Sequence, residues 1–158
     1  MAENQNIVGE QLQARLSKLI GQWSQGRVTL KQIVGLSDEE LYAIAEQGYL
    51  LFLQGKSDDA RTVFEGLVAI DPKNAYYYRA LGAIYWRLKE PQKAIKQFTY
   101  AIRVSPKEIS SYVNRAEINV SLGQFKAARS DLTTALRIAT AVDKALVKKA
   151  QAMLRLIP

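Results

Sequence analysis

A pattern of residue types recurs every thirty-four residues through the middle of the chain, and this period constrains the fold more than any other feature. In residues 75–108 the pattern consists of Tyr78, Leu81, Gly82, Tyr85, Ala94, Phe98, Ala101 and Pro106. One period earlier stand Ile44, Gln47, Gly48, Leu51, Ala60, Phe64, Leu67 and Pro72. One period later stand Tyr112, Arg115, Ala116, Asn119, Ala128, Leu132, Ala135 and Thr140. A period of this length predicts an array of similar structural units.

The pattern resembles the tetratricopeptide repeat, W-x-x-L-G-x-x-Y…A-x-x-x-F…P, with Tyr78 in place of the tryptophan. The resemblance implies two antiparallel helices per repeat. Small residues such as Gly82 let the two backbones approach, and large ones such as Phe98 fill the space around them. We therefore expect an all-α, right-handed solenoid of three tetratricopeptide repeats, at 41–74, 75–108 and 109–142.

Signals for helix ends place the repeat helices. Ser37 and Glu40 form an S-x-x-E capping box, so the first helix is expected to begin near Asp38. Ser57 and Asn74 are expected to cap the second and third helices, and Pro91 suits the first turn of the fourth. The expected repeat helices cover about 38–54, 57–70, 75–89, 91–105, 109–121 and 125–139.

Segments outside the period flank the repeats. Residues 9–24 are predicted to form an amphipathic helix that ends at Gly26, followed by a linker at 27–36. This divides the chain into 1–36 and a repeat domain at 37–158, in which a helix at 143–157 covers the open end of the solenoid. The N-terminal helix either caps the first repeat or pairs with another chain. The candidate dimer contacts are Leu12, Leu16, Leu19 and Trp23.

Composition argues against catalysis. The chain has no Cys and no His, which excludes disulfides and thiolate metal sites and removes the commonest general base. The sequence shows no serine–base pair, metal-ligand cluster or phosphate loop, so we expect neither an enzyme nor a cofactor or metal. No stretch has the character of a signal peptide or a membrane span, so we expect a cytoplasmic protein without stable membrane insertion.

Charge is distributed unevenly along the chain. The net charge is +7, but residues 1–79 hold 8 Lys+Arg and 10 Asp+Glu, whereas residues 80–158 hold 14 and 5. This asymmetry could attract an acidic partner or a nucleic acid. The bases are scattered singly and no nucleic-acid-binding motif accompanies them, so we favour solvated helix faces and expect no nucleic-acid partner.

Two predicted helices carry a second apolar face besides the one that packs in the core. By the geometry of the repeat that the chain resembles, this face lines the concave side of the solenoid. The predicted partner-binding residues are Tyr42, Ala45, Tyr49, Phe52, Tyr76, Arg79, Ala83 and Trp86. Apolar rows of this kind usually mark binding sites. The alternative is that they pack on the N-terminal helix or on another subunit.

Residues 28–37, V-T-L-K-Q-I-V-G-L-S, and the first repeat together resemble the class II chaperones of bacterial type III secretion. The resemblance implies a chaperone that holds an extended N-terminal segment of a hydrophobic translocator protein in its groove. Such a chaperone keeps the segment soluble before export, and many members form homodimers through their N-terminal region. The alternative function is a general tetratricopeptide-repeat scaffold that docks an acidic protein through its basic C-terminal half.

Overall fold

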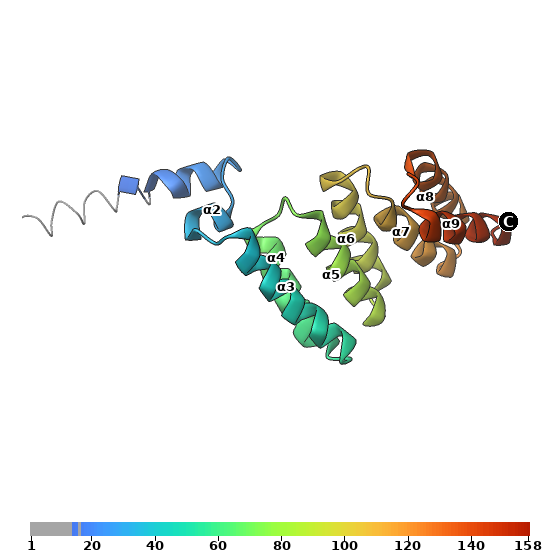
Figure 1. Cartoon of the computed structure of the whole chain (residues 1–158), viewed down its shortest axis with the longest axis horizontal. Helices are drawn as coiled ribbons and strands as arrows, with labels where there is room; N and C mark the ends of the chain where they lie inside the picture. Colours follow the sequence, from blue (N-terminus) through green and yellow to red (C-terminus); the bar gives the residue numbers. More distant parts are fainter. Residues whose placement is uncertain (1–13, 16) are drawn as a thin grey trace, which may run out of the picture.

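The computed structural model describes residues 14–15 and 17–158, and helix is the regular secondary structure throughout that part of the chain. Seven helices follow one another along the long axis of the molecule, and two shorter helical segments, at 17–24 and Leu30–Val34 (α2), precede them (Figure 1). The seven are α3 (Asp38–Leu53), α4 (Ser57–Ile70), α5 (Ala75–Arg87), α6 (Pro91–Val104), α7 (Ile109–Ser121), α8 (Phe125–Ile138) and α9 (Lys144–Leu156). They form three helix pairs and a closing helix, which confirms the predicted all-α solenoid.

Most helix ends lie where the sequence places them. Ser37 and Glu40 form the expected capping box on α3, and the Asn74 side chain accepts a hydrogen bond from the backbone of Tyr76. Pro91 occupies the first turn of α6. Ser57, by contrast, does not cap α4. It is the first residue of that helix and is buried, and Lys56 occupies the cap position after Gly55, whose φ of 82° is left-handed.

The linker that was expected at 27–36 contains α2. Thr29 and Gln32 form a capping box at its start, and Gly35 ends it with a left-handed φ of 78°. Lys31 of α2 donates a hydrogen bond to Asp38 of α3 and lies 4.0 Å from Asp71, next to the end of α4. The T-x-x-Q spacing that marks this short helix is the same kind of signal as the Ser37 box.

The two helices of each repeat touch at a small residue. An added Cβ on Gly48 would lie 2.8 Å from Val63 and 2.9 Å from the ring of Phe64. On Gly82 it would lie 2.9 Å from two ring atoms of Phe98. The third repeat places Ala116 where the others have glycine and pairs it with Leu132 instead of phenylalanine. Residue size on one helix is therefore matched to residue size on the other.

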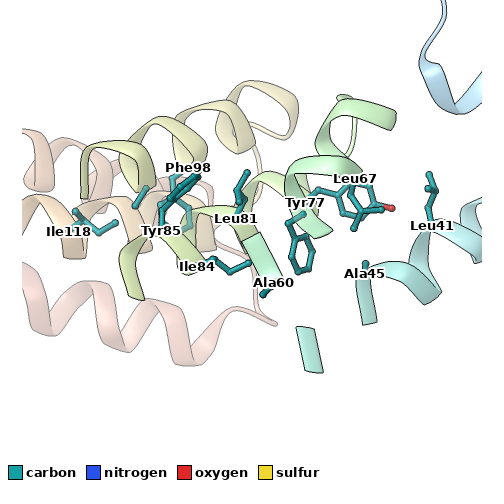
Figure 2. Packing of buried hydrophobic residues seen from close by; sticks show 12 residues of the cluster. Leu41, Ala45, Ala60, Leu67, Tyr77, Leu81, Ile84, Tyr85, Phe98 and Ile118 are labelled. Carbon is teal, nitrogen blue, oxygen red and sulfur yellow. The ribbon is translucent and has the colours of Figure 1, made fainter. Parts of the chain in front are cut away.

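The buried residues form two apolar clusters. The first joins repeats 1 and 2 through Phe64, Leu81 and Phe98, and Figure 2 shows its side chains between the helix pairs. The second joins repeat 3 to α9 through Val113, Leu132 and others.

A charged network marks the boundary between the two clusters. Arg115 forms a two-point ion pair with Asp131 at 2.6 and 2.8 Å, and it donates a further hydrogen bond of 2.8 Å to Thr99 of α6. Arg115 thereby ties the third repeat to the second. Since Asp131 is buried, loss of either partner would leave a charge without compensation.

Across the residues that the structure describes, no helix is both long and apolar enough to cross a membrane.

Gly82→Ala should lower the free energy of unfolding by about 1–3 kcal/mol, because the new methyl group meets the buried ring of Phe98. Gly66→Ala is the matched control, since nothing lies within 4 Å of that position and alanine favours helix. The double variant Gly82→Ala/Phe98→Leu reproduces the Ala–Leu pairing of the third repeat. Its loss of unfolding free energy should be smaller than the sum of the losses in Gly82→Ala and Phe98→Leu. Urea unfolding measures the stability of these three variants and of the Gly66→Ala control. Equal stabilisation by Gly82→Ala and Gly66→Ala would contradict the size matching.

Lys89 is the one non-glycine residue of the described chain with a positive φ, 62°. It stands one repeat period after Gly55 and one before Gly123, which share this conformation (φ 82° and 70°). Because a left-handed residue cannot continue a right-handed helix, α5 ends at Arg87, with Leu88 as its cap, and not at Lys89 as expected.

Lys89→Gly should raise the free energy of unfolding by about 0.5 kcal/mol, because relief of about 1–2 kcal/mol of strain exceeds the added freedom of the unfolded chain. Gly123→Lys should lower it by about 1–2 kcal/mol. Thermal melts of both variants check the pair, and a destabilising Lys89→Gly would refute the account.

Candidate functional site

The first helices of the three repeats enclose a hollow on one side of the solenoid. Its volume is about 560 Å³. Its lining residues come from α3, α5 and α7, with one residue of α4 at the back: Tyr49, Phe52, Phe64, Tyr76, Arg79, Ala80, Ala83, Ile84, Glu108, Ser110 and Asn114. Most of this surface is apolar or aromatic, and the polar residues lie toward α7.

Further hollows adjoin the first and share its walls. One of about 460 Å³ extends past Phe52, Ala83 and Asn114 to Trp86. Another of about 440 Å³ extends past Tyr49 and Tyr76 to Tyr42. We call the three hollows together the groove. It runs across the first helices of all three repeats.

Seven of the eight residues predicted to bind a partner line the groove. They are Tyr42, Tyr49, Phe52, Tyr76, Arg79, Ala83 and Trp86. Tyr42 and Tyr49 are 60% and 48% exposed, so large parts of both rings face solvent. The structure thus brings the predicted set together on one surface. Whether that surface binds a partner stays a prediction.

Ala45 is the exception and corrects the expected set. Its side chain is 0% exposed and belongs to the core cluster with Leu41. Four residues on a helix amount to about 40° of rotation, so Ala45 shares the buried face of Leu41 and not the exposed face of Tyr42. It supports the groove from beneath and offers no surface to a partner.

Aromatic and cationic side chains shape the groove walls. Tyr76 meets Phe64 edge to face, with ring centres 6.1 Å apart. Arg79 lies 5.5 Å from the centre of the Tyr76 ring. At the other end, Arg87 lies 4.0 Å from the centre of the Phe52 ring and donates a hydrogen bond of 2.6 Å to the Phe52 carbonyl. These contacts hold the aromatic rings in place across the boundary between repeats 1 and 2.

Glu108 forms the polar end of the groove. Its carboxylate accepts hydrogen bonds from the backbone of Ser110 and Ser111, at 3.0 and 3.3 Å, and so caps α7. It also lies 3.2 Å from Arg79, which neutralises that cation within the groove. Burial alone would raise the pKa of Glu108, but the hydrogen bonds from both serines, together with Arg79, lower it below its ordinary value.

Phe64 and Glu108 are among the groove residues that were not predicted as such. Glu108 has a signal in the sequence, because it stands one repeat period after the helix cap Asn74. Phe64 was assigned only to the core, yet it belongs to both the core cluster and the groove wall.

The candidate dimer contacts are placed only in part. Leu12 and Leu16 lie outside the described residues. Leu19 is half-buried, and Trp23 is 47% exposed. Ile44 of α3 is a further exposed apolar residue, at 41%, and it lines none of the three hollows. It was expected to pack within the repeats, but the side of α3 that it occupies is left open at this end of the solenoid.

Comparison with protein families identifies the repeats. Models of the tetratricopeptide repeat match residues 48–89, 75–108 and 109–141, which together span more than half of the chain. This chain is a tetratricopeptide-repeat protein. The matched families are repeat modules and none is a catalytic domain.

Several solved structures similar to this one come from bacterial type III secretion. A type III secretion complex from Aeromonas hydrophila is 25% identical, with a TM-score of 0.83 over 89% of this chain and 95% of the other. PcrH of Pseudomonas aeruginosa, in complex with the chaperone binding region of PopD, is 29% identical, with a TM-score of 0.74 over 78% and 94%. The Yersinia enterocolitica translocator chaperone SycD is 23% identical, with a TM-score of 0.79 over 82% and 98%, and shows the shared fold alone.

Curated relatives share the repeats over a small part of their length. Human serine/threonine-protein phosphatase 5 is 31% identical over 81 residues, which are 51% of this chain but 16% of that protein. The rice U-box domain-containing protein 70 is 25% identical over 100 residues, or 63% and 12%. The aligned part is about a sixth or less of each relative, so their activities do not carry over to this chain.

Glu108→Gln should lower the free energy of unfolding at neutral pH by about 1–2 kcal/mol, because a charged helix cap and an ion pair are lost. The folded-state pKa of Glu108 is lowered, so its contribution is complete above the ordinary value of 4.5 and is lost as the pH falls through the folded value. The stability difference between wild type and variant should therefore shrink below that pH.

Urea unfolding between pH 7 and pH 3 follows this difference. Glu39→Gln on the exposed first turn of α3 is the control for removal of a helix-start carboxylate. A stability difference for Glu108→Gln that stayed constant over this range would show that the charge of Glu108 does not stabilise the fold.

Proposed function

We propose that this chain is a non-enzymatic chaperone that binds an extended apolar segment of a secreted translocator-type protein in its groove. It would keep that segment soluble in the cytoplasm before type III export. The observation that carries the proposal is the row of aromatic residues along the groove, from Tyr42 through Tyr49 and Tyr76 to Trp86. Exposed apolar surface of this extent is typical of a binding site.

The dimensions of the groove favour an extended segment. Neighbouring packed helices are about 10 Å apart. Three residues of an extended chain span about the same distance, so side chains three residues apart would reach successive hollows. The partner is therefore expected to carry apolar anchors at spacings of about three residues.

Polar groups in the groove suit the backbone of such a segment. Ser110 and Asn114 lie on the α7 side of the main hollow, opposite Tyr49 and Phe52. A bound chain with apolar side chains toward α3 and α5 would turn peptide groups toward these two residues. Peptide groups buried on binding need such partners, because a buried polar group without a hydrogen bond is costly.

The similarity to PcrH supports the choice of partner. PcrH has been solved with the chaperone binding regions of PopD and of PopB, each time at 29% identity to this chain. The helices that wall the groove here lie largely within the family matches, which run from 48 to 141. A homodimer through Leu12, Leu16, Leu19 and Trp23 remains a further prediction of the same resemblance.

Tyr49→Ala and Trp86→Ala should each weaken binding of a fluorescein-labelled peptide from the chaperone binding region of PopD by about tenfold or more. Both changes remove an aromatic anchor, and aromatic anchors dominate binding energies. Fluorescence anisotropy measures the affinity. It should change little between low and moderate salt, because apolar contacts are not screened.

Tyr112→Ala is the matched control, since this tyrosine lies on α7 but lines none of the hollows that form the groove. Circular dichroism checks that each variant keeps its helices. If the folded Tyr49 and Trp86 variants bind the peptide as tightly as the wild type, the groove is not the binding site.

A further inference from the structure

The carboxylates of the C-terminal half are all engaged within the molecule. Glu90 pairs with Lys93 and Arg61, Glu117 with Lys149 at 2.7 Å, and Asp131 with Arg115. Glu108 pairs with Arg79 and caps α7, and Asp143 accepts two hydrogen bonds of 2.7 Å from Thr140. Most of the 14 basic residues of this half are left without a carboxylate partner among the described residues.

Four of these cations form what we call the basic outer face: Lys96 and Arg103 on α6, and Lys126 and Arg137 on α8. All four are exposed. The two helices are the second helices of successive repeats, and Arg103 and Arg137 are one period apart, so they occupy the same position in each repeat. None of the four lines the groove, whose walls are built mainly by α3, α5 and α7.

The basic outer face has a single sign of charge. Helix α6 contains no acidic residue, and the one acidic residue of α8, Asp131, is buried against Arg115. Lys96 and Arg103 lie 6.0 and 5.7 Å from the Tyr100 ring, which orients them without neutralising them. The charge on this face is therefore uncompensated in the described structure.

The first repeat does not continue the basic outer face. On α4, Asp58 stands in the position of Lys126, Thr62 in that of Lys96, and Ala69 in that of Arg103 and Arg137. None of these residues is a cation. A negatively charged ligand would therefore be attracted to α6 and α8 and not to α4, which restricts where along the solenoid it docks.

The residues between the cations indicate the kind of ligand. On α8, Ser130 and Thr133 line the hollow between Lys126 and Arg137, and their hydroxyls are donors suited to carboxylates. Arg129 and Thr134 line the same hollow but already donate to the backbone carbonyls of Pro158 and Ser130. The face lacks a row of exposed apolar side chains of the kind that enters a membrane. Its aromatic ring, Tyr100, is half-buried against Tyr78, with ring centres 5.5 Å apart, and so offers little surface on which a nucleic-acid base could stack.

We propose that the basic outer face binds an acidic segment, rich in Asp and Glu, of another protein. The occupant docks across α6 and α8 on the second and third repeats and leaves the groove open. A chain bound in this way could hold one partner in the groove and a second on the outer face. The proposal rests on the charges of α6 and α8 and is independent of what the groove binds.

The test uses a fluorescein-labelled poly-glutamate peptide of about 15 residues, with affinity measured by anisotropy at low salt. The triple variant Arg103→Glu, Lys126→Glu, Arg137→Glu should bind about tenfold or more weakly. The matched control, Arg27→Glu, Lys56→Glu, Lys73→Glu, changes the net charge equally on the first half of the chain and should lose about twofold at most. Substitution of the same three outer residues by Gln provides a second, milder variant should the reversals impair folding.

Parallel titrations with vesicles of phosphatidylserine and phosphatidylcholine, and with a single-stranded oligonucleotide, separate the ligand classes. The assignment to an acidic protein segment would be overturned if the wild type bound the vesicles or the oligonucleotide more tightly than poly-glutamate and lost that binding in the triple variant. Equal losses in the two triple variants would show that only net charge matters. Tyr49→Ala should leave poly-glutamate binding unchanged, so failure of this proposal and failure of the groove proposal are distinguishable.

Discussion

The close contact between the two helices of each repeat is the constraint on which the rest of the structure depends. Gly48 and Gly82 have no room for a Cβ, because the rings of Phe64 and Phe98 lie against them. When two helices approach this closely, the small residue between them is fully buried. The large aromatic ring of the second helix then lies across the first helix at that residue. One repeat alone could not cover those rings, so the repeats must stack.

The same contacts make the floor of the groove. Phe64, which packs on Gly48, forms the back of the main hollow, and Phe98, which packs on Gly82, lies at the back of the hollow that reaches Trp86. The signature that specifies the fold therefore also sets the depth of the candidate site. Other groove positions, such as the exposed Tyr42 and Tyr49, lie outside the core cluster and do not determine the helix packing.

The sequence predicts the fold closely because the same pattern of small and large residues occurs three times, once in each helix pair. The period defines the helix pairs, and Ser37, Asn74 and Pro91 define three starts, each by a local interaction that involves few neighbours. The sequence was less informative where two faces of a helix meet. Ala45 lies about 40° from Leu41 and about 60° from Tyr42 around α3, so helix geometry alone left its face open, and packing in the core cluster buries it. Glu108 was missed because its role joins a helix cap on α7 to a cation on α5, which a linear reading does not bring together.

Both junctions between repeats combine apolar packing with polar contacts. Repeats 1 and 2 share one apolar cluster and the ion pair of Arg61 with Glu90, and the main hollow of the groove lies where they meet. The same cluster reaches the third repeat through Ile118 of α7, and repeats 2 and 3 are also tied by Arg79 with Glu108 and by Arg115 with Thr99. Apolar side chains of a bound partner would extend the first junction and add to its buried surface, so binding there also stabilises the first repeat against the second. The second junction already satisfies its charges internally, which leaves the exposed cations of α6 and α8 to act outside the groove.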